Sequence, residues 1–281
     1  MAQVLWVGFG DIGQRTSSQL LNLGYKVTGA RRSPTKPNSA LVSNYVQGDA
    51  KNADAWRHWL TERPQIIILT LTPSEYSEDA YRASYLLPVQ TMLSVLEQIE
   101  GYQPTIYFIS STSVYGDEEG NWVNEESVTK PDGFSGQTML ACEQLLRASS
   151  YAGAILRCSG IYGPGRLRML NSVRSKNITL RNNWTNRVHS DDIARALVFL
   201  CGQPTTKMDV LLVTDDAPSL QTEVVTWLAA ELSLDITDLI TNAPPSKLGG
   251  KRISNKKLKS LGFTFSYPTF KHGYQALIDN K

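Results

Sequence analysis

The sequence predicts an α/β fold built on a doubly wound parallel sheet, with a smaller C-terminal lobe. Short apolar segments alternate with segments of helical period through the first 160 residues. The first apolar segment, Val4–Val7, runs directly into a glycine-rich turn. The segment Gln65–Leu71 reads QIIILTL, without the polar alternation of a half-exposed strand, so it predicts a strand buried on both faces. In such a sheet ligands bind beyond the carboxyl ends of the strands, so the loops after the strands carry the chemistry.

The elements are expected in the following order. After the first strand come a helix over 12–23 that stops at Gly24, a strand over 26–30, a short extended stretch at 45–46, a helix over 54–62, the strand 65–71, a helix over 81–99 around Pro88, a strand over 105–110, a helix over 134–148 and a strand over 152–156. Beyond Gly163 the pattern loosens, and 209–214 predicts a further strand. We therefore expect residues 1–160 to form the dinucleotide-binding domain, with 187–215 returning to it. The remainder of 161–281 forms the smaller, substrate-side lobe.

The turn after the first strand has the spacing GxGxxG at Gly8, Gly10 and Gly13. The first glycine permits a sharp turn, the second lets backbone N–H groups approach a pyrophosphate, and the third lets the helix pack closely on the strand. The helix N-terminus supplies partial positive charge. The alternative is a tight turn without a ligand. The predicted cofactor-binding residues are Gly8, Phe9, Gly10, Asp11, Ile12 and Gly13, together with Thr70 and Leu71 at the end of the strand expected over 65–71.

The residues after the second strand distinguish NAD from NADP. An acidic residue there binds the ribose hydroxyls of NAD and repels a 2′-phosphate. Here the sequence is Gly-Ala-Arg31-Arg32-Ser33, and two guanidinium groups suit a phosphate dianion. NADP(H) is therefore predicted over NAD, the alternative being that both arginines are ordinary exposed loop residues. Asp49 is expected to bond the adenine amino group.

Composition excludes several function classes. A net charge of +2 argues against nucleic acid as a partner, and the basic residues between Lys247 and Lys259 are expected on a solvated helix face with its flanks. No apolar run is long enough to span a bilayer, and a strand so close to Met1 leaves no room for a signal peptide, so a cytoplasmic protein is expected. The three cysteines and three histidines lack metal-ligand spacing, so no metal is predicted.

Several blocks together resemble the extended and atypical short-chain dehydrogenases/reductases, the epimerase/dehydratase group with a Rossmann fold. They are the glycine loop, SSTSVYGD at 110–117, Leu156-Arg157 followed by IYGPG at 161–165, and VHSDDIA at 188–194. The resemblance implies that Ser111 orients a substrate carbonyl or alcohol, the alternative being a turn or capping serine. It also implies a homodimer formed through the helices over 81–99 and 134–148.

The chain departs from that family at its catalytic positions. Aligning ACEQLL at 141–146 puts Ser135 where the family has the tyrosine of YxxxK, and Met139 where it has the lysine. A serine hydroxyl is too weak an acid for that role, and a thioether carries no charge. The family's arginine that binds a nucleotide-sugar diphosphate corresponds to Thr185 in this chain. The family's asparagine before the IYGPG block corresponds to Gly160. A nucleotide-sugar substrate is therefore in doubt, and Arg187 either holds a different anion or pairs with the acidic residues at 191–192.

The titratable residues that could replace the missing tyrosine as general acid/base are Tyr115, Tyr162 and His189. Of these His189 has the most suitable intrinsic pKa. The predicted catalytic residues are Ser111, Tyr115 and His189. The leading hypothesis is an NADP(H)-binding oxidoreductase or epimerase/dehydratase-like enzyme acting on a small carbonyl or alcohol substrate. The alternative is an NADP(H)-binding regulator that has lost turnover. A serine hydrolase using Ser111, His189 and Asp191 ranks far below, because the GxSxG elbow is missing.

Overall fold

The computed structural model describes residues 2–34, 38–116, 118–237 and 247–279. The chain divides into two compact units, each assembled from separate segments. Unit 1 comprises the described residues of 1–114, 129–157 and 194–211, and unit 2 those of 115–128, 158–193 and 212–281.

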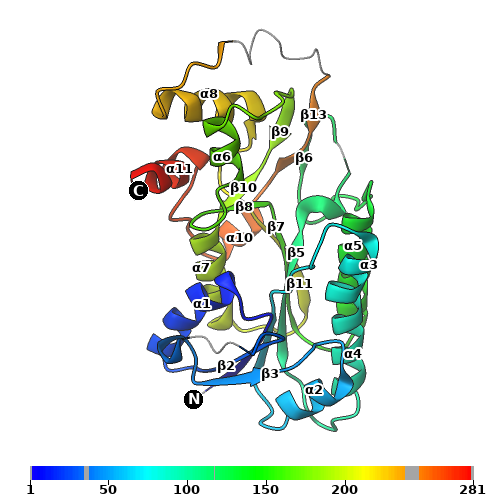
Figure 1. Ribbon diagram of the computed structural model, residues 1–281. Coiled ribbons are helices and arrows are strands. Elements are labelled where there is room, and N and C mark those ends of the chain that lie inside the picture. The colour runs from blue at the N-terminus through cyan, green and yellow to red at the C-terminus, as the bar shows by residue number, and fades with distance from the viewer. Residues whose placement is uncertain (1, 35–37, 117, 238–246, 280–281) are drawn as a thin grey trace. The chain divides into compact units, whose positions relative to one another are not determined.

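Unit 1 is built on a seven-stranded sheet of order β11-β7-β5-β4-β1-β2-β3 (Figure 1). The strands are β1 (Gln3–Val7), β2 (Lys26–Arg31), β3 (Asn44–Gln47), β4 (Ile66–Leu69), β5 (Thr105–Ser111), β7 (Gly153–Cys158) and β11 (Met208–Val213). The last residues of β7 and β11 belong to unit 2. The pairs β1–β2, β2–β3, β1–β4 and β4–β5 are parallel. From β1 the chain adds strands first toward β3 and then toward β11, so the predicted doubly wound α/β sheet is confirmed.

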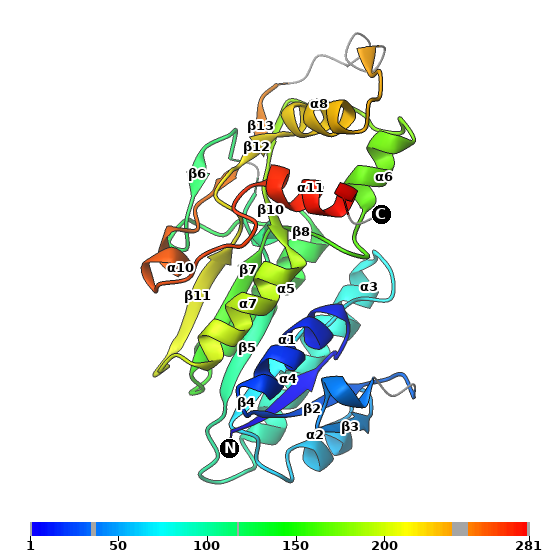
Figure 2. The same ribbon diagram turned by 90° about the vertical axis from the view of Figure 1, so that its left-hand side faces the viewer.

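Helices cover both faces of this sheet. They are α1 (Asp11–Asn22), α2 (Ala53–Trp59), α3 (Glu78–Tyr81), α4 (Leu87–Leu96), α5 (Phe134–Ala148) and α7 (Ser190–Cys201), whose first turn belongs to unit 2. Figures 1 and 2 show α1 on one face and α4 and α5 on the other. The helix predicted around Pro88 forms, but it is not α-helical throughout. A π-helical turn at Arg82–Leu86 connects α3 to α4. Pro88 then lies in the first turn of α4, directly after this π-helical turn, and has no N–H to donate to it.

The described residues of unit 2 form three small sheets and four helices. The strands are β6 (Trp122–Val123), β8 (Gly160–Tyr162), β9 (Asn183–Thr185), β10 (Arg187–His189), β12 (Ser219–Leu220), β13 (Gly249–Gly250) and β14 (Arg252–Ile253). They pair as β10-β8, β12-β9-β13 and β14-β6. The helices are α6 (Arg168–Arg174), α8 (Gln221–Glu231), α10 (Lys256–Ser260) and α11 (Phe270–Asp279).

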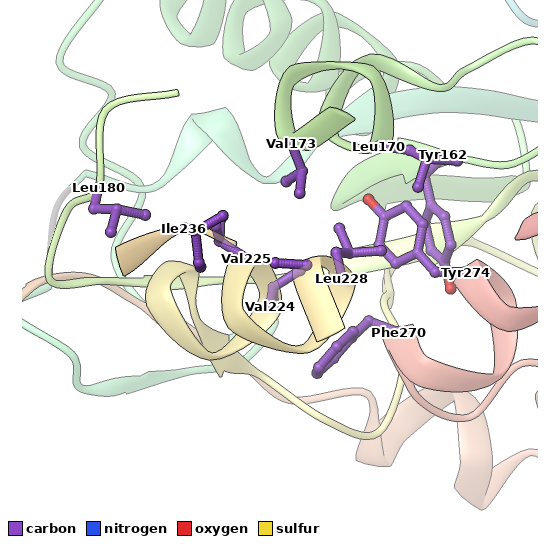
Figure 3. Close-up of a cluster of buried hydrophobic side chains, with 11 residues drawn as sticks. Tyr162, Leu170, Val173, Leu180, Val224, Val225, Leu228, Ile236, Phe270 and Tyr274 are labelled. Atoms are coloured by element: carbon purple, nitrogen blue, oxygen red, sulfur yellow. The ribbon is translucent and has the colours of Figure 1, made fainter. Parts of the chain in front are cut away.

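An apolar cluster holds α6, α8 and α11 together (Figure 3). Leu170 and Val173 come from α6, while Val224 and Leu228 come from α8, and all four are fully buried. At one end of the cluster the rings of Tyr162 and Tyr274 face one another, with centroids 4.5 Å apart. Aromatic and aliphatic burial of this kind is what stabilises a small lobe with little regular sheet.

Two details differ from the sequence-based expectations. Of the segment 187–215, the residues 187–193 and 212–215 belong to unit 2, because Arg187–His189 pairs with β8. The basic C-terminal segment is not simply a solvated helix face. Lys251 Nζ donates to the carbonyl oxygens of Tyr115 and Gly116 at 2.8 and 3.0 Å, and the Arg252 guanidinium lies over the Trp122 and Trp184 rings. Both side chains therefore hold the 115–128 segment in unit 2. None of the helices in the described ranges is long and apolar enough to cross a membrane.

Candidate functional site

The glycine loop after β1 makes the tight turn that the sequence predicts. Gly8 has φ +81°, and a Cβ added to it would lie 2.6 Å from the Thr70 carbonyl oxygen. The N–H groups of Gly8 and Phe9 donate to the Ala30 carbonyl, at 2.9 and 3.2 Å. Only glycine combines this φ with so close an approach. The loop is thereby fixed against the ends of β2 and β4.

The first turn of α1 follows without a side-chain cap, because its N-cap residue is Gly10. The first intrahelical bond runs from Gln14 N–H to the Gly10 carbonyl at 2.9 Å, so the amides of residues 11–13 precede it. Such amides, together with the helix dipole, form an anion site. Asp11 lies beside this turn, but its carboxylate pairs with Arg15 at 2.7 Å.

A cavity of about 460 Å³ opens at this loop, within unit 1. Among the predicted cofactor residues, those that line it are Gly8, Phe9, Gly10, Arg31, Arg32, Asp49, Thr70 and Leu71. Ile12 and Gly13 are instead buried behind the loop, Gly13 against the rings of Trp6 and Phe9. Ser33, which follows the two arginines, also lines it, and further lining residues that sequence reasoning missed include Lys51, Thr72 and Ser74. A glycine-floored cavity with an anion-binding helix end at one side fits a dinucleotide.

The lining after β2 is cationic. Arg31 is half-buried, and its guanidinium lies 5.8 Å from the centre of the Tyr45 ring, while Arg32 is exposed. The Tyr45 hydroxyl donates to the Ser33 carbonyl, which fixes this turn. Asp49 lies on the same cavity wall, paired with Lys51 at 3.6 Å. The chain thus offers a phosphate two guanidinium groups and a hydroxyl at this end of the cavity.

Thr70 holds the glycine loop rather than only lining the cavity. Its hydroxyl accepts a hydrogen bond from the Trp6 indole N–H at 2.7 Å and donates to the Gly8 carbonyl at 2.9 Å. Trp6 is fully buried. The side chain therefore links the buried face of β1 to the turn on which the cofactor would rest.

Ser111 ends β5, and its Oγ accepts the Ser113 N–H at 3.1 Å. The preceding residue, Ser110, contacts a buried ion pair. Ser110 Oγ donates to Glu143 at 2.5 Å, and Arg157 forms a bidentate ion pair with Glu143, with its shortest contact at 2.6 Å. Both charged side chains are at most 2% exposed. Glu143 and Arg157 therefore fix α5 and β7 to β5 at Ser110, the residue before Ser111.

The two positions that depart from the family pattern lie on α5. Ser135 is half-buried in its first turn, and Met139 is buried one turn later. Gly136 between them packs directly on the Ser113 carbonyl, so α5 begins against the turn that follows Ser111.

The other predicted catalytic residues belong to unit 2. The Tyr115 hydroxyl is part-buried and donates to the Asn124 carbonyl at 2.7 Å. His189 is buried, with Nδ1 accepting the Asp191 N–H at 3.2 Å and its ring stacked on Tyr267 at 3.8 Å. Because Nδ1 accepts this bond, the neutral ring carries its proton on Nε2, and the Asp191 carboxylate 3.5 Å away pairs with it only when the ring is charged. These contacts give both side chains structural duties, and their catalytic roles stay predictions. Asp117 lies outside the described residues.

A second cavity, of about 560 Å³, lies within unit 2. Arg187 forms part of its wall and is 6% exposed, while Arg166, Arg168 and Arg181 are exposed. Among the described lining residues none is Asp or Glu. Thr185, where the family arginine would fall, does not line the cavity, since its hydroxyl donates to the Ser219 carbonyl at 2.7 Å. The arrangement can attract and hold an anion.

Buried polar atoms without partners cluster around Arg187. Within the described part of the chain, the Tyr162 hydroxyl, which lines this cavity, and Asp215 Oδ2 have no hydrogen-bond partner. Burial raises the pKa of Asp215 to about 8, against the opposing effects of its hydrogen bond from Ala217 N–H and of Arg187. Burial likewise raises the pKa of Tyr162. Of these two groups only the Tyr162 hydroxyl lies in the cavity wall, and a buried polar group of this kind is usually completed by a ligand or by water.

Comparison with known proteins agrees with this geometry. The profile of the NAD-dependent epimerase/dehydratase family matches residues 7–212. The chain belongs to this family. A Methylobacillus flagellatus protein described as an NAD-dependent epimerase/dehydratase is 33% identical, with a TM-score of 0.85 over 99% of this chain and 98% of that one. The protein YeeZ of Escherichia coli K12 is 26% identical over 95% of this chain and 97% of its own length. MoeE5, solved with UDP-glucuronic acid and NAD, shares the fold at 21% identity, with a TM-score of 0.79 over 97% of this chain and 96% of that one.

Proposed function

We propose that the protein is an NADP(H)-dependent enzyme of the epimerase/dehydratase class that oxidises or reduces a small alcohol or carbonyl substrate bearing an anionic group. The observation that carries the cofactor proposal is the pair Arg31 and Arg32 lining the cavity after β2. Bound NADP(H) supplies or accepts the hydride. The chain's own contribution is to hold the pyrophosphate on the glycine loop and the first turn of α1, and the 2′-phosphate on the two arginines.

The cofactor proposal is tested by fluorescence titration of NADPH and NADH. We expect NADPH to bind at least tenfold more tightly, because charge-assisted hydrogen bonds to a phosphate are each worth about 1.5–3 kcal/mol. Replacing both Arg31 and Arg32 with Ala should remove this preference and leave NADH binding within threefold. Arg57→Ala is the matched control, since Arg57 is exposed, pairs with Asp54 and lies outside the cavity wall. A preference for NADPH that survives the double substitution would refute the proposal.

The arginines of the second cavity support an anionic substrate. Sugar nucleotides are the first compounds to test, because MoeE5 was solved with one and each carries phosphates. With pyrophosphate as the probe, calorimetry should detect binding that weakens at least fivefold in Arg168→Ala and Arg181→Ala. Lys271→Ala, which removes an exposed cation of α11 outside the cavity, should bind as the wild type does. Equal binding by all of these proteins would exclude the cavity as an anion site.

The second candidate is an NADP(H)-binding regulator, which Ser135 and Met139 favour because neither supports proton transfer. The two candidates differ in turnover. A panel of aldehydes, ketones, alcohols and sugar nucleotides, assayed with NADPH and NADP⁺, decides between them. Oxidation or reduction of the cofactor by any member supports the enzyme, whereas binding of NADPH without any turnover supports the regulator.

A further inference from the structure

Tyr76 brings a phenol to the position where helix α5 has only a serine. Its hydroxyl lies 3.4 Å from Ser135 Oγ, within hydrogen-bond distance. The ring is 74% exposed, so the hydroxyl is accessible to a substrate. Both residues belong to unit 1.

The loop that carries Tyr76 is also a wall of the cofactor cavity. It leaves β4 at Thr70, and Thr72 and Ser74 line the cavity. The loop is fixed at both ends, by the bonds of Thr70 to Trp6 and Gly8 and by Ser77, whose Oγ caps α3 by accepting the Ala80 N–H at 3.2 Å. Tyr76 therefore sits two residues past the cavity wall on a tethered segment.

Ring packing holds the phenol in place despite its exposure. The Tyr76 ring contacts Phe134 at 4.9 Å between centroids and Tyr81 at 5.6 Å in an edge-to-face arrangement. Phe134 is the first residue of α5 and directly precedes Ser135. An exposed tyrosine fixed by two aromatic neighbours and one hydroxyl is pre-organised, as a group that transfers protons has to be.

The same corner of unit 1 contains Ser111. The turn after Ser111 packs on the first turn of α5, through the Ser113 carbonyl and Gly136. Ser111 lies at the carboxyl end of β5, which is the edge where ligands bind in doubly wound sheets. Ser111 thus lies two residues before the carbonyl that packs beside Ser135, and of these hydroxyls the Tyr76 phenol is the strongest acid.

We propose that Tyr76 is the proton donor and acceptor of the reaction, with Ser135 as its positioning residue. This inference rests on the proposed function. In the reducing direction the substrate carbonyl carbon gains the hydride, its oxygen gains the Tyr76 proton, and the tyrosinate takes a proton from water. The carbonyl is reduced by two electrons, and NADPH is oxidised to NADP⁺. Ser135 hydrogen-bonds the phenol oxygen and stabilises the tyrosinate.

Tyr76→Phe tests the proposal, because it removes the hydroxyl and keeps the ring that packs on Phe134. Turnover of NADPH with any active member of the substrate panel should fall by at least 10². Ser135→Ala should lower turnover less, and should move the pH profile of alcohol oxidation to higher pH. Tyr25→Phe is the matched control and should stay within twofold, because it removes a tyrosine hydroxyl that donates to the Cys201 carbonyl at 3.1 Å and has no part in this cluster. All variants should bind NADPH with unchanged affinity.

A second readout does not depend on turnover. In protein labelled with [ζ-¹³C]tyrosine, the Tyr76 resonance is the one absent from Tyr76→Phe, and saturating NADP⁺ should shift it. An unmoved Tyr76 resonance in protein saturated with NADP⁺, or full turnover by Tyr76→Phe, overturns the role of Tyr76 while leaving the cofactor proposal intact. Failure of the wild type to bind NADPH overturns both.

Discussion

The buried ion pair between Glu143 and Arg157 predicts a large and specific loss of stability in Glu143→Gln. The substitution keeps the shape of the side chain but leaves the Arg157 charge, about 2% exposed, facing a neutral amide. It also weakens the 2.5 Å hydrogen bond from Ser110. Breaking one partner of a buried pair costs about 3–5 kcal/mol, because the remaining charge stays desolvated. At roughly 2–4 °C per kcal/mol for a chain of this size, Tm should fall by about 6–20 °C.

Urea unfolding followed by circular dichroism measures this loss directly, with differential scanning calorimetry as the thermal check. Glu97→Gln is the matched control, since Glu97 is exposed at the end of α4, and it should change the free energy of unfolding by less than about 0.5 kcal/mol. The double substitution Glu143→Leu with Arg157→Met removes both charges and should recover most of the loss. A loss below about 1 kcal/mol in Glu143→Gln would refute the reasoning, because another group would then have to stabilise the buried Arg157 charge.

Three further predictions concern the loop, a buried acid and the thiols. Gly8→Ala should abolish NADPH binding in a fluorescence titration, because the added Cβ lies 2.6 Å from the Thr70 carbonyl oxygen at φ +81°; binding within twofold of wild type would contradict the assigned loop geometry. Since Asp215 has a folded pKa of about 8 against an ordinary 3.8, the folded state keeps its proton while the unfolded chain loses it. Stability should therefore fall between about pH 4 and 8, by up to about 1.4 kcal/mol per unit. Urea unfolding at pH 5 and 7.5 should give a smaller fall in Asp215→Asn, and an equal fall in both proteins would reject the assignment. Burial raises the pKa of the Cys142, Cys158 and Cys201 thiols to about 12. Native protein should therefore react slowly with Ellman's reagent and unfolded protein fast, and rapid labelling of the native protein would contradict the burial of these thiols.

The sequence predicted the sheet well because its signals are local. The glycine loop and the fully apolar strand β4 depend on neighbouring residues only, and α5 spans Phe134–Ala148 as expected. The helix around Pro88 forms as predicted in outline, but the π-helical turn before it packs on α5, a segment distant in the sequence.

The candidate site was less predictable, because its parts come from distant segments. The ACEQLL motif places Glu143 on α5, but its pairing with Arg157 on β7 joins two elements that are separate in the sequence. Tyr76 lies in a loop without a motif, and only its distance to Ser135 reveals it. One signal was available and was missed. No Asp or Glu occurs between Glu143 and Asp191, while five arginines lie between residues 166 and 187. That bias indicates the cationic cavity of unit 2.

The interleaving of the two units limits how the protein can be dissected. A fragment ending at residue 160 would keep β7 but lose its neighbour β11. All six residues of β7 are buried, so the fragment would present a long apolar strand with an open edge. It would also carry residues 115–128 without the Gly250 carbonyl that accepts the Gly120 N–H at 2.8 Å. Expressed alone, such a fragment is expected to aggregate, so the cofactor-binding half of this chain is obtained in folded form only with the whole chain.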